Sequence, residues 1–279
     1  MNLRRFNLLH LIFALAFLSG LGLRLLNLGA APLSEPEAEL ALQAFRLARG
    51  EAPAVLDPQA AYLALTSLSF ALFGSSDFLA RFWPALAGSL LVLAPWLLAG
   101  EAGKRRSTPL STPAAAVLAF GFALDPSLIA VSRQAGSPML ALSFTLLSIS
   151  CWTTSRWVWA AVFGALALLS GPSFLAGAVI LAATWLIGRL ILGRWVPDLG
   201  EAELPLPAAE SRWNLYLAAG ATLLLGGSLF LLYPQILAAW FGSLSAYLSG
   251  WTAPVEIPGS RLLAAVWVYQ PLALLFALI

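Results

Sequence analysis

Apolar runs of about 20 residues recur along most of the chain, and short polar or proline-containing segments separate them. A helix of that length matches the hydrocarbon thickness of a bilayer. One apolar stretch is too long for a single span and is divided where Ser170-Gly171-Pro172-Ser173 interrupts it. The pattern therefore predicts eight membrane-spanning helices, at residues 8–28, 78–98, 113–131, 138–154, 157–170, 173–191, 213–232 and 262–279.

Residues 32–77, between the first two predicted spans, form the most polar early segment of the chain. Apolar residues recur there at helical spacing over 37–49, which predicts an amphipathic helix. A second helix is expected over 58–73, with Asp57 as its cap and Pro58 at its first position. We expect both helices to lie at the membrane interface, within an outer loop.

Composition supports a membrane protein, because 60% of the 279 residues are hydrophobic and only 10% are charged. An ordinary soluble domain has roughly a quarter of its residues charged. The expected fold is an all-α, polytopic transmembrane protein. Its single histidine, His10, lies at the start of the first apolar run, so neither a histidine-based metal site nor a serine–histidine triad is expected. Its single cysteine, Cys151, excludes an internal disulfide.

The charges divide between the two predicted sides of the membrane. The predicted inner side carries Arg4, Arg5, Lys104, Arg105, Arg106, Arg156, Arg189, Arg194 and Arg212. The predicted outer side carries Glu35, Glu37, Glu39, Glu51, Asp57, Asp77, Asp125 and Glu256. The positive-inside rule then predicts an integral protein of a bacterial-type plasma membrane, with a cytoplasmic N-terminus and its active face outside. Because the basic residues lie at span ends and form no stripe, no nucleic-acid partner is predicted.

Candidate chemistry lies in the acidic outer loop, since the sequence contains no Walker loop, zinc signature or dinucleotide-binding glycine pattern. A loop carboxylate is suited to act as a general base, or to bind a divalent cation that holds a phosphate leaving group. An arginine at a span end, Arg81 or Arg133, is suited to bind a lipid-linked phosphate. The alternative is that the arginines reach lipid headgroups and the carboxylates are simply solvated.

Short polar motifs follow one another in a recognisable order over roughly the first 160 residues. They are Pro32-Leu33-Ser34-Glu35-Pro36-Glu37-Ala38, residues 44–50, Asp57-Pro58 with Tyr62, Leu72-Phe73-Gly74-Ser75, Ala80-Arg81-Phe82, Asp125-Pro126-Ser127 and Ser132-Arg133-Gln134-Ala135-Gly136-Ser137. In this order they resemble the N-terminal part of the GT-C fold membrane glycosyltransferases of family 39, the protein mannosyltransferase and aminoarabinose transferase group.

The resemblance implies transfer of a sugar from a polyprenyl-phosphate donor to an acceptor lipid, glycan or protein on the outer face, with inversion at the anomeric carbon. It implies Glu37 and Glu35 as catalytic carboxylates. It also implies substrate-binding roles for Arg133, Arg81, Asp57 and Tyr62. A divalent cation is an open question, and no metal ligand is assigned. The final apolar run has no polar flank, so we expect the protein to continue beyond Ile279.

The chain departs from the family pattern at three polar positions. Pro36 stands where the family has the aspartate of an Asp-Glu pair, Asp57-Pro58-Gln59 replaces a Lys-Pro-Pro stretch, and Ser137 replaces an acidic residue. Either the carboxylates of Glu35, Glu37 and Asp57 act in a rearranged way, or the protein is an inactive relative that binds a lipid-linked glycan or assists another transferase. A transporter is a third hypothesis, which predicts paired broken helices and charges at the membrane midplane.

Overall fold

The computed structural model describes residues 3–51, 53, 55–99, 111–191, 206–250, 258–261 and 264. Every regular element among these residues is an α-helix, which confirms the prediction of an all-α protein. The chain divides into two units, residues 1–243 and 244–279. The candidate site described below lies within the first unit.

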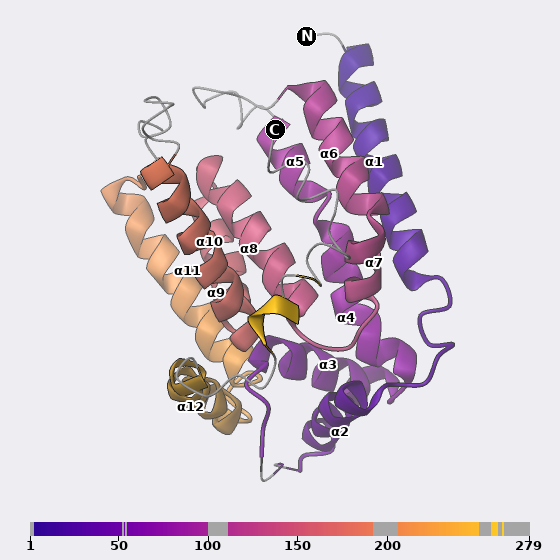
Figure 1. Ribbon diagram of the computed structural model, residues 1–279, viewed down its shortest axis with the longest axis vertical. Helices are drawn as coiled ribbons and strands as arrows, with labels where there is room; N and C mark the ends of the chain where they lie inside the picture. The colour runs from indigo at the N-terminus through magenta and orange to yellow at the C-terminus, as the bar shows by residue number, and fades with distance from the viewer. Residues whose placement is uncertain are drawn as a thin grey trace. The chain divides into compact units, whose positions relative to one another are not determined.

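The helices of the described residues follow the predicted apolar runs closely (Figure 1). They are α1 (Leu3–Leu25), α2 (Glu35–Ala48), α3 (Ala60–Phe73), α4 (Asp77–Leu90), α5 (Leu93–Ala99), α6 (Thr112–Leu124), α7 (Pro126–Ser132), α8 (Pro138–Thr153), α9 (Trp157–Leu168), α10 (Pro172–Ile191), α11 (Ala209–Gly227) and α12 (Pro234–Gly250).

Among the described residues, one continuous helical segment is long and apolar enough to cross a membrane, Asp77–Ala99, which contains α4 and α5. Two further spans are possible if each bent pair counts as one: α6 with α7, which meet at 51°, and α9 with α10, which meet at 113°. Residues 10–25 of α1 and all of α8 are apolar but shorter. The span predicted at 262–279 and the basic loop at 104–106 lie outside the described residues, apart from residue 264.

The first loop, residues 32–77, contains α2 and α3, which lie at one end of α4 in Figure 1. The predicted amphipathic character of α2 is confirmed, because one face buries Glu37, Leu40, Ala41, Ala44 and Leu47. This helix starts two residues earlier than predicted. Ser34 and Glu37 form a capping box, and Pro36 occupies the first turn, where its missing N–H costs nothing.

The start predicted for α3 is wrong by two residues. The helix begins at Ala60, with Gln59 in the N-cap position, so Asp57 is not its cap and Pro58 is not its first residue. Instead, Oδ1 of Asp57 accepts a hydrogen bond from the Gln59 N–H, which forms a local turn before the helix. The predicted end at Phe73 is confirmed, and Gly74 follows with a φ of 84°.

The end predicted for the helix over 213–232 is also wrong. Helix α11 stops at Gly227, because Leu229, Phe230 and Leu231 all adopt positive φ angles, which no α-helix contains. The chain then enters α12, which occupies part of the segment predicted to lie outside the membrane.

Candidate functional site

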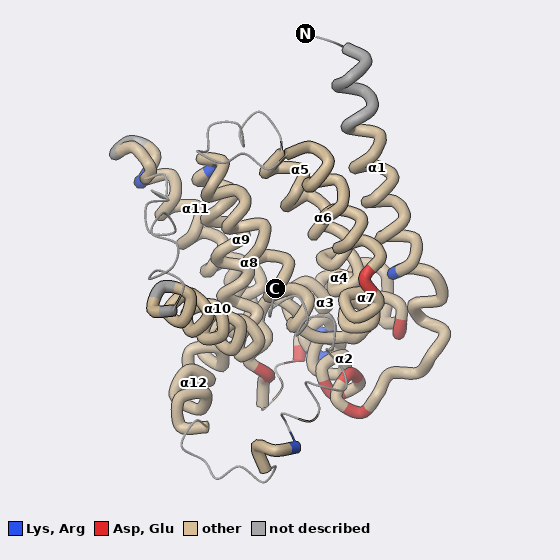
Figure 2. Tube along the Cα trace, turned by 45° about the horizontal axis from the view of Figure 1, so that its top comes forward, with Lys and Arg blue, Asp and Glu red and all other residues tan. Residues whose placement is uncertain are grey.

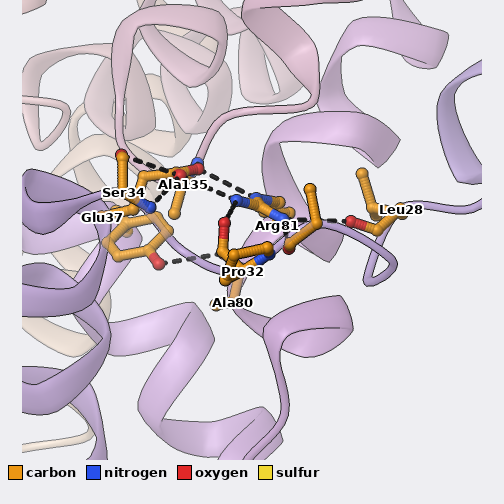
Figure 3. Close-up of polar contacts among 9 residues, drawn as sticks. Leu28, Pro32, Ser34, Glu37, Ala80, Arg81 and Ala135 are labelled. Atoms are coloured by element: carbon orange, nitrogen blue, oxygen red, sulfur yellow. Dashed lines mark hydrogen bonds and ion pairs between the residues drawn. The ribbon is translucent and has the colours of Figure 1, made fainter.

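A buried ion pair joins α2 to α4 (Figure 3). Nε of Arg81 donates to Oε1 of Glu37 at 2.9 Å, and Nη2 donates to Oε2 at 2.8 Å. The two side chains are only 7% and 10% exposed. Two parallel hydrogen bonds of this kind are the strongest geometry that an arginine and a carboxylate adopt.

The remaining partners of Glu37 leave its carboxylate fully engaged. The backbone N–H and the hydroxyl of Ser34 each donate to Oε2 at 2.9 Å, and the N–H of Ala135 donates to Oε1 at 2.7 Å. These donors, and Arg81 above all, lower the pKa of Glu37 to about 2. A carboxylate with so low a pKa is a weak base, so the contacts give Glu37 a structural role. Its predicted catalytic role stays a prediction.

Arg81 also binds the chain that leads into α2. Its Nη1 donates to the carbonyl of Ala31 at 2.7 Å, and its Nη2 to that of Pro32 at 3.0 Å. The guanidinium therefore connects the carboxylate of Glu37 to the backbone of Ala31 and Pro32. These contacts account for its burial without a lipid phosphate. Tyr62 lies nearby in the core, fully buried, and its hydroxyl donates to the carbonyl of Ala80 at 2.9 Å.

Arg133 lies at the end of α7 and binds the end of α1. Its Nη1 donates to the carbonyls of Leu23 at 2.9 Å and Leu26 at 2.7 Å, and its Nη2 donates to that of Asn27 at 3.2 Å. Helix C-terminal carbonyls lack intrahelical partners and favour a cation. Arg133 would have to release these carbonyls before it bound a phosphate, so its predicted substrate role stays a prediction.

Asp57 differs from Glu37 in two respects that matter for acid–base chemistry: it has no ion-pair partner among the described residues, and its pKa is raised, not lowered. Its side chain is half-buried, and its backbone N–H donates to Oε1 of Gln43 on α2 at 2.8 Å. Burial raises the pKa of Asp57; the hydrogen bonds from Gln59 lower it in part, and the negative charge of Glu39 raises it. Raised pKa values at a partly exposed carboxylate are typical of general bases.

Two segments distant in sequence, residues 134–137 and 169–173, converge on the turn that holds Asp57. Oε1 of Gln59 accepts the N–H of Ser137 at 2.6 Å, and the N–H of Ala61 donates to the carbonyl of Leu169 at 2.9 Å. The hydroxyls of Ser137 and Ser173 lie 3.3 Å apart. We call this arrangement the polar junction: residues 57–61, 134–137 and 169–173. The sequence does not predict Gln43 and Ser173 as site residues, because a single polar side chain within α2 or in the first turn of α10 is a weak signal.

Gly171 allows the polar junction to close, and replacing it with alanine is expected to destabilise the protein by about 1–3 kcal/mol. Its φ is 71°, and a Cβ atom there would lie 2.5 Å from the carbonyl oxygen of Pro58. Thermal unfolding in detergent would measure the effect. The matched control is Gly177→Ala within α10, where a Cβ meets no heavy atom within 4 Å, and where stabilisation of about 0.5–1 kcal/mol is expected. Equal effects of the two changes would contradict the close contact.

Glu35 is exposed in the first turn of α2, away from the polar contacts of Glu37. The described residues contain no group of three or more histidine, cysteine, aspartate or glutamate side chains able to hold a metal ion. No protein family, no curated protein and no solved structure matches the chain. The functional interpretation therefore depends on the geometry of the polar junction.

Proposed function

We propose that the protein is an integral membrane glycosyltransferase that moves a sugar from a polyprenyl-phosphate donor to an extracytoplasmic acceptor. Three features support the proposal: the apolar composition, the apolar helices that include Asp77–Ala99, and the ordered motifs that resemble the GT-C transferases. In this proposal the first loop and the polar junction face outward, and the loop supplies the reacting carboxylate.

One observation carries the proposal: Asp57 is a half-buried carboxylate with a raised pKa, positioned by Gln43 and Gln59. Gln43 accepts the backbone N–H of Asp57, and the N–H of Gln59 donates to its carboxylate, so the carboxylate is held in place before substrate binds. Such preorganisation is what a catalytic group requires. We therefore assign the base to Asp57, and we assign to Glu37 and Arg81 the task of fixing α2, which carries Gln43.

The proposed reaction is a single displacement at the anomeric carbon. Asp57 takes the proton of an acceptor hydroxyl, and the acceptor oxygen forms a bond to the anomeric carbon from the face opposite the phosphate. The bond between that carbon and the phosphate oxygen breaks, and polyprenyl phosphate leaves with the electron pair. The configuration at the anomeric carbon is thereby inverted. The protonated Asp57 then loses its proton to water.

The purified full-length protein is expected to transfer labelled sugar from at least one member of a panel of polyprenyl-phosphate hexoses and pentoses. The assay measures both the glycosylated acceptor and the released polyprenyl phosphate, with an active family 39 transferase as the positive control. Donor binding without release of polyprenyl phosphate would contradict the enzyme and favour the inactive relative that binds a lipid-linked glycan. The inactive relative is the second candidate because both carboxylate oxygens of Glu37 already accept hydrogen bonds within the protein.

A further inference from the structure

Helix α2 presents a regular stripe of exposed residues on the face opposite its buried side. The stripe consists of Glu35, Glu39, Leu42, Arg46 and Arg49, which follow one another at intervals of four and three residues. This spacing keeps all five on one face, as in a heptad repeat. Figure 2 shows acidic residues gathered around α2. The stripe is acidic in its first half, apolar at its centre and basic in its second half.

Among the described residues the charges of the stripe have no ionic partner, because the one ion pair found there is Glu37–Arg81. Glu35 and Glu39 are one helical turn apart, so their like charges repel, and Arg46 and Arg49 repel in the same way. The helix dipole favours acids at the start of α2 and bases at its end. The dipole does not account for the exposed Leu42 between them, which is 48% exposed.

An apolar groove of about 290 Å³ runs beside the stripe. Ala38, Ala41, Leu42 and Phe45 of α2 form one wall, and Phe70 of α3 contributes to the other. The guanidinium of Arg49 lies over the ring of Phe45, 4.7 Å from its centre. The groove therefore combines small and aromatic side chains with the polar Ser75, Ser76 and Asp77, a lining that suits an amphipathic helix.

The stripe is complementary to itself when two copies run antiparallel. A two-fold axis at Leu42 brings Glu39 level with Arg46 of the second copy, and Glu35 level with Arg49, within about one residue rise of 1.5 Å. The same axis sets the small Ala38 against the large Phe45 of the second copy. Each ion pair occurs twice, as a two-fold interface requires.

We propose that the exposed face of α2 is a homodimer interface in which two copies of this helix pack antiparallel about Leu42. Two copies in one membrane are related by an axis along the membrane normal, and a helix that lies in the membrane plane then meets its copy antiparallel. The interface does not depend on the transferase reaction, and it uses charged side chains that form no ion pair among the described residues.

Charge reversal tests the register of the proposed dimer. Glu39→Lys and Arg46→Glu are each expected to weaken dimerisation in liposomes by about tenfold, since each places two like-charged pairs in the interface. The double variant Glu39→Lys/Arg46→Glu restores both pairs and is expected to dimerise within about twofold of the original protein. Single-molecule photobleaching over a range of protein-to-lipid ratios measures the dimer fraction. A double variant no better than the single variants would overturn the proposal.

Disulfide cross-linking tests the position of the axis. Leu42→Cys is expected to form a covalent dimer with copper phenanthroline as the oxidant, because the axis places the two thiols together. Val117→Cys on α6 is the control, since Val117 is 72% exposed on another helix, and the native Cys151 is buried. Cross-linking at Leu42→Cys well above that at Val117→Cys supports the interface. Equal cross-linking of the two variants would overturn it, whatever the outcome of the sugar-transfer assay.

Discussion

Replacing Asp57 with asparagine is expected to slow sugar transfer by about 100-fold to 10 000-fold and to leave the protein folded. The amide keeps the size of the side chain, and the bond from the Asp57 N–H to Gln43 involves only the backbone of residue 57. What is lost is the group that accepts the acceptor's proton. Single-turnover rates with a polyprenyl-phosphate sugar measure the effect, and thermal unfolding checks the fold.

The control for this change is Glu51→Gln, which alters an exposed carboxylate of the same loop and is expected to leave the rate unchanged. The pH profile separates a base from a merely structural carboxylate. Because burial raises the pKa of Asp57, its basic form is lost as the pH falls through that raised value, so the rate of the original protein rises with pH on the acidic side. If Asp57→Asn left the transfer rate unchanged, Asp57 would not be the base, and another residue of the loop would have to take that role.

Replacing Glu37 with glutamine is expected to destabilise the folded protein by about 3–5 kcal/mol, the usual effect of removing one partner from a buried ion pair. The variant leaves Arg81, whose side chain is 7% exposed, without its counter-charge. Thermal or denaturant unfolding in detergent measures the loss. Glu51→Gln again serves as the control, with an expected change within about 0.5 kcal/mol, as for other exposed sites.

The pH dependence of stability gives an independent check on Glu37. Its pKa is lowered from 4.5 to about 2 in the folded protein, so Glu37 binds a proton more readily when the protein is unfolded. Protonation of Glu37 therefore favours unfolding. The stabilisation is complete above pH 4.5 and is lost progressively as the pH falls from about 4.5 to about 2. Glu37→Gln lacks this component. If the variant instead kept full stability and lost only sugar transfer, Glu37 would be catalytic and the structural role assigned to it would be wrong.

Local patterns in the sequence determined the helical class and most helix positions. Apolar runs set the positions of α4 and α8, and the Ser170-Gly171-Pro172-Ser173 break correctly separated α9 from α10. The amphipathic spacing of α2 was also visible, because the residues that share a helix face are three or four positions apart. The bounds went wrong where neighbouring groups competed, as at Asp57, whose carboxylate binds the Gln59 N–H and delays the start of α3.

The candidate site was only partly visible in the sequence. The sequence predicts Glu37 and Arg81 as separate catalytic and phosphate-binding residues, whereas the structure joins them in one buried pair. Asp57 was chosen as a substrate ligand, while its contacts to Gln43 and Gln59 were not foreseen. The sequence therefore identifies Glu37, Arg81 and Asp57 as functional candidates by residue type, but it does not show which residues they contact.

The sequence alone therefore predicts most of the helices, their apolar faces and the acidic first loop, but not α12. Only the tertiary structure decided which carboxylate is engaged and which is held with a raised pKa. The reason is physical: helix formation depends on residues within a few positions of one another, whereas the pKa of a carboxylate depends on donors and burial supplied by distant segments. Arg81 lies 44 residues from Glu37, and Ser137 lies 78 residues from Gln59.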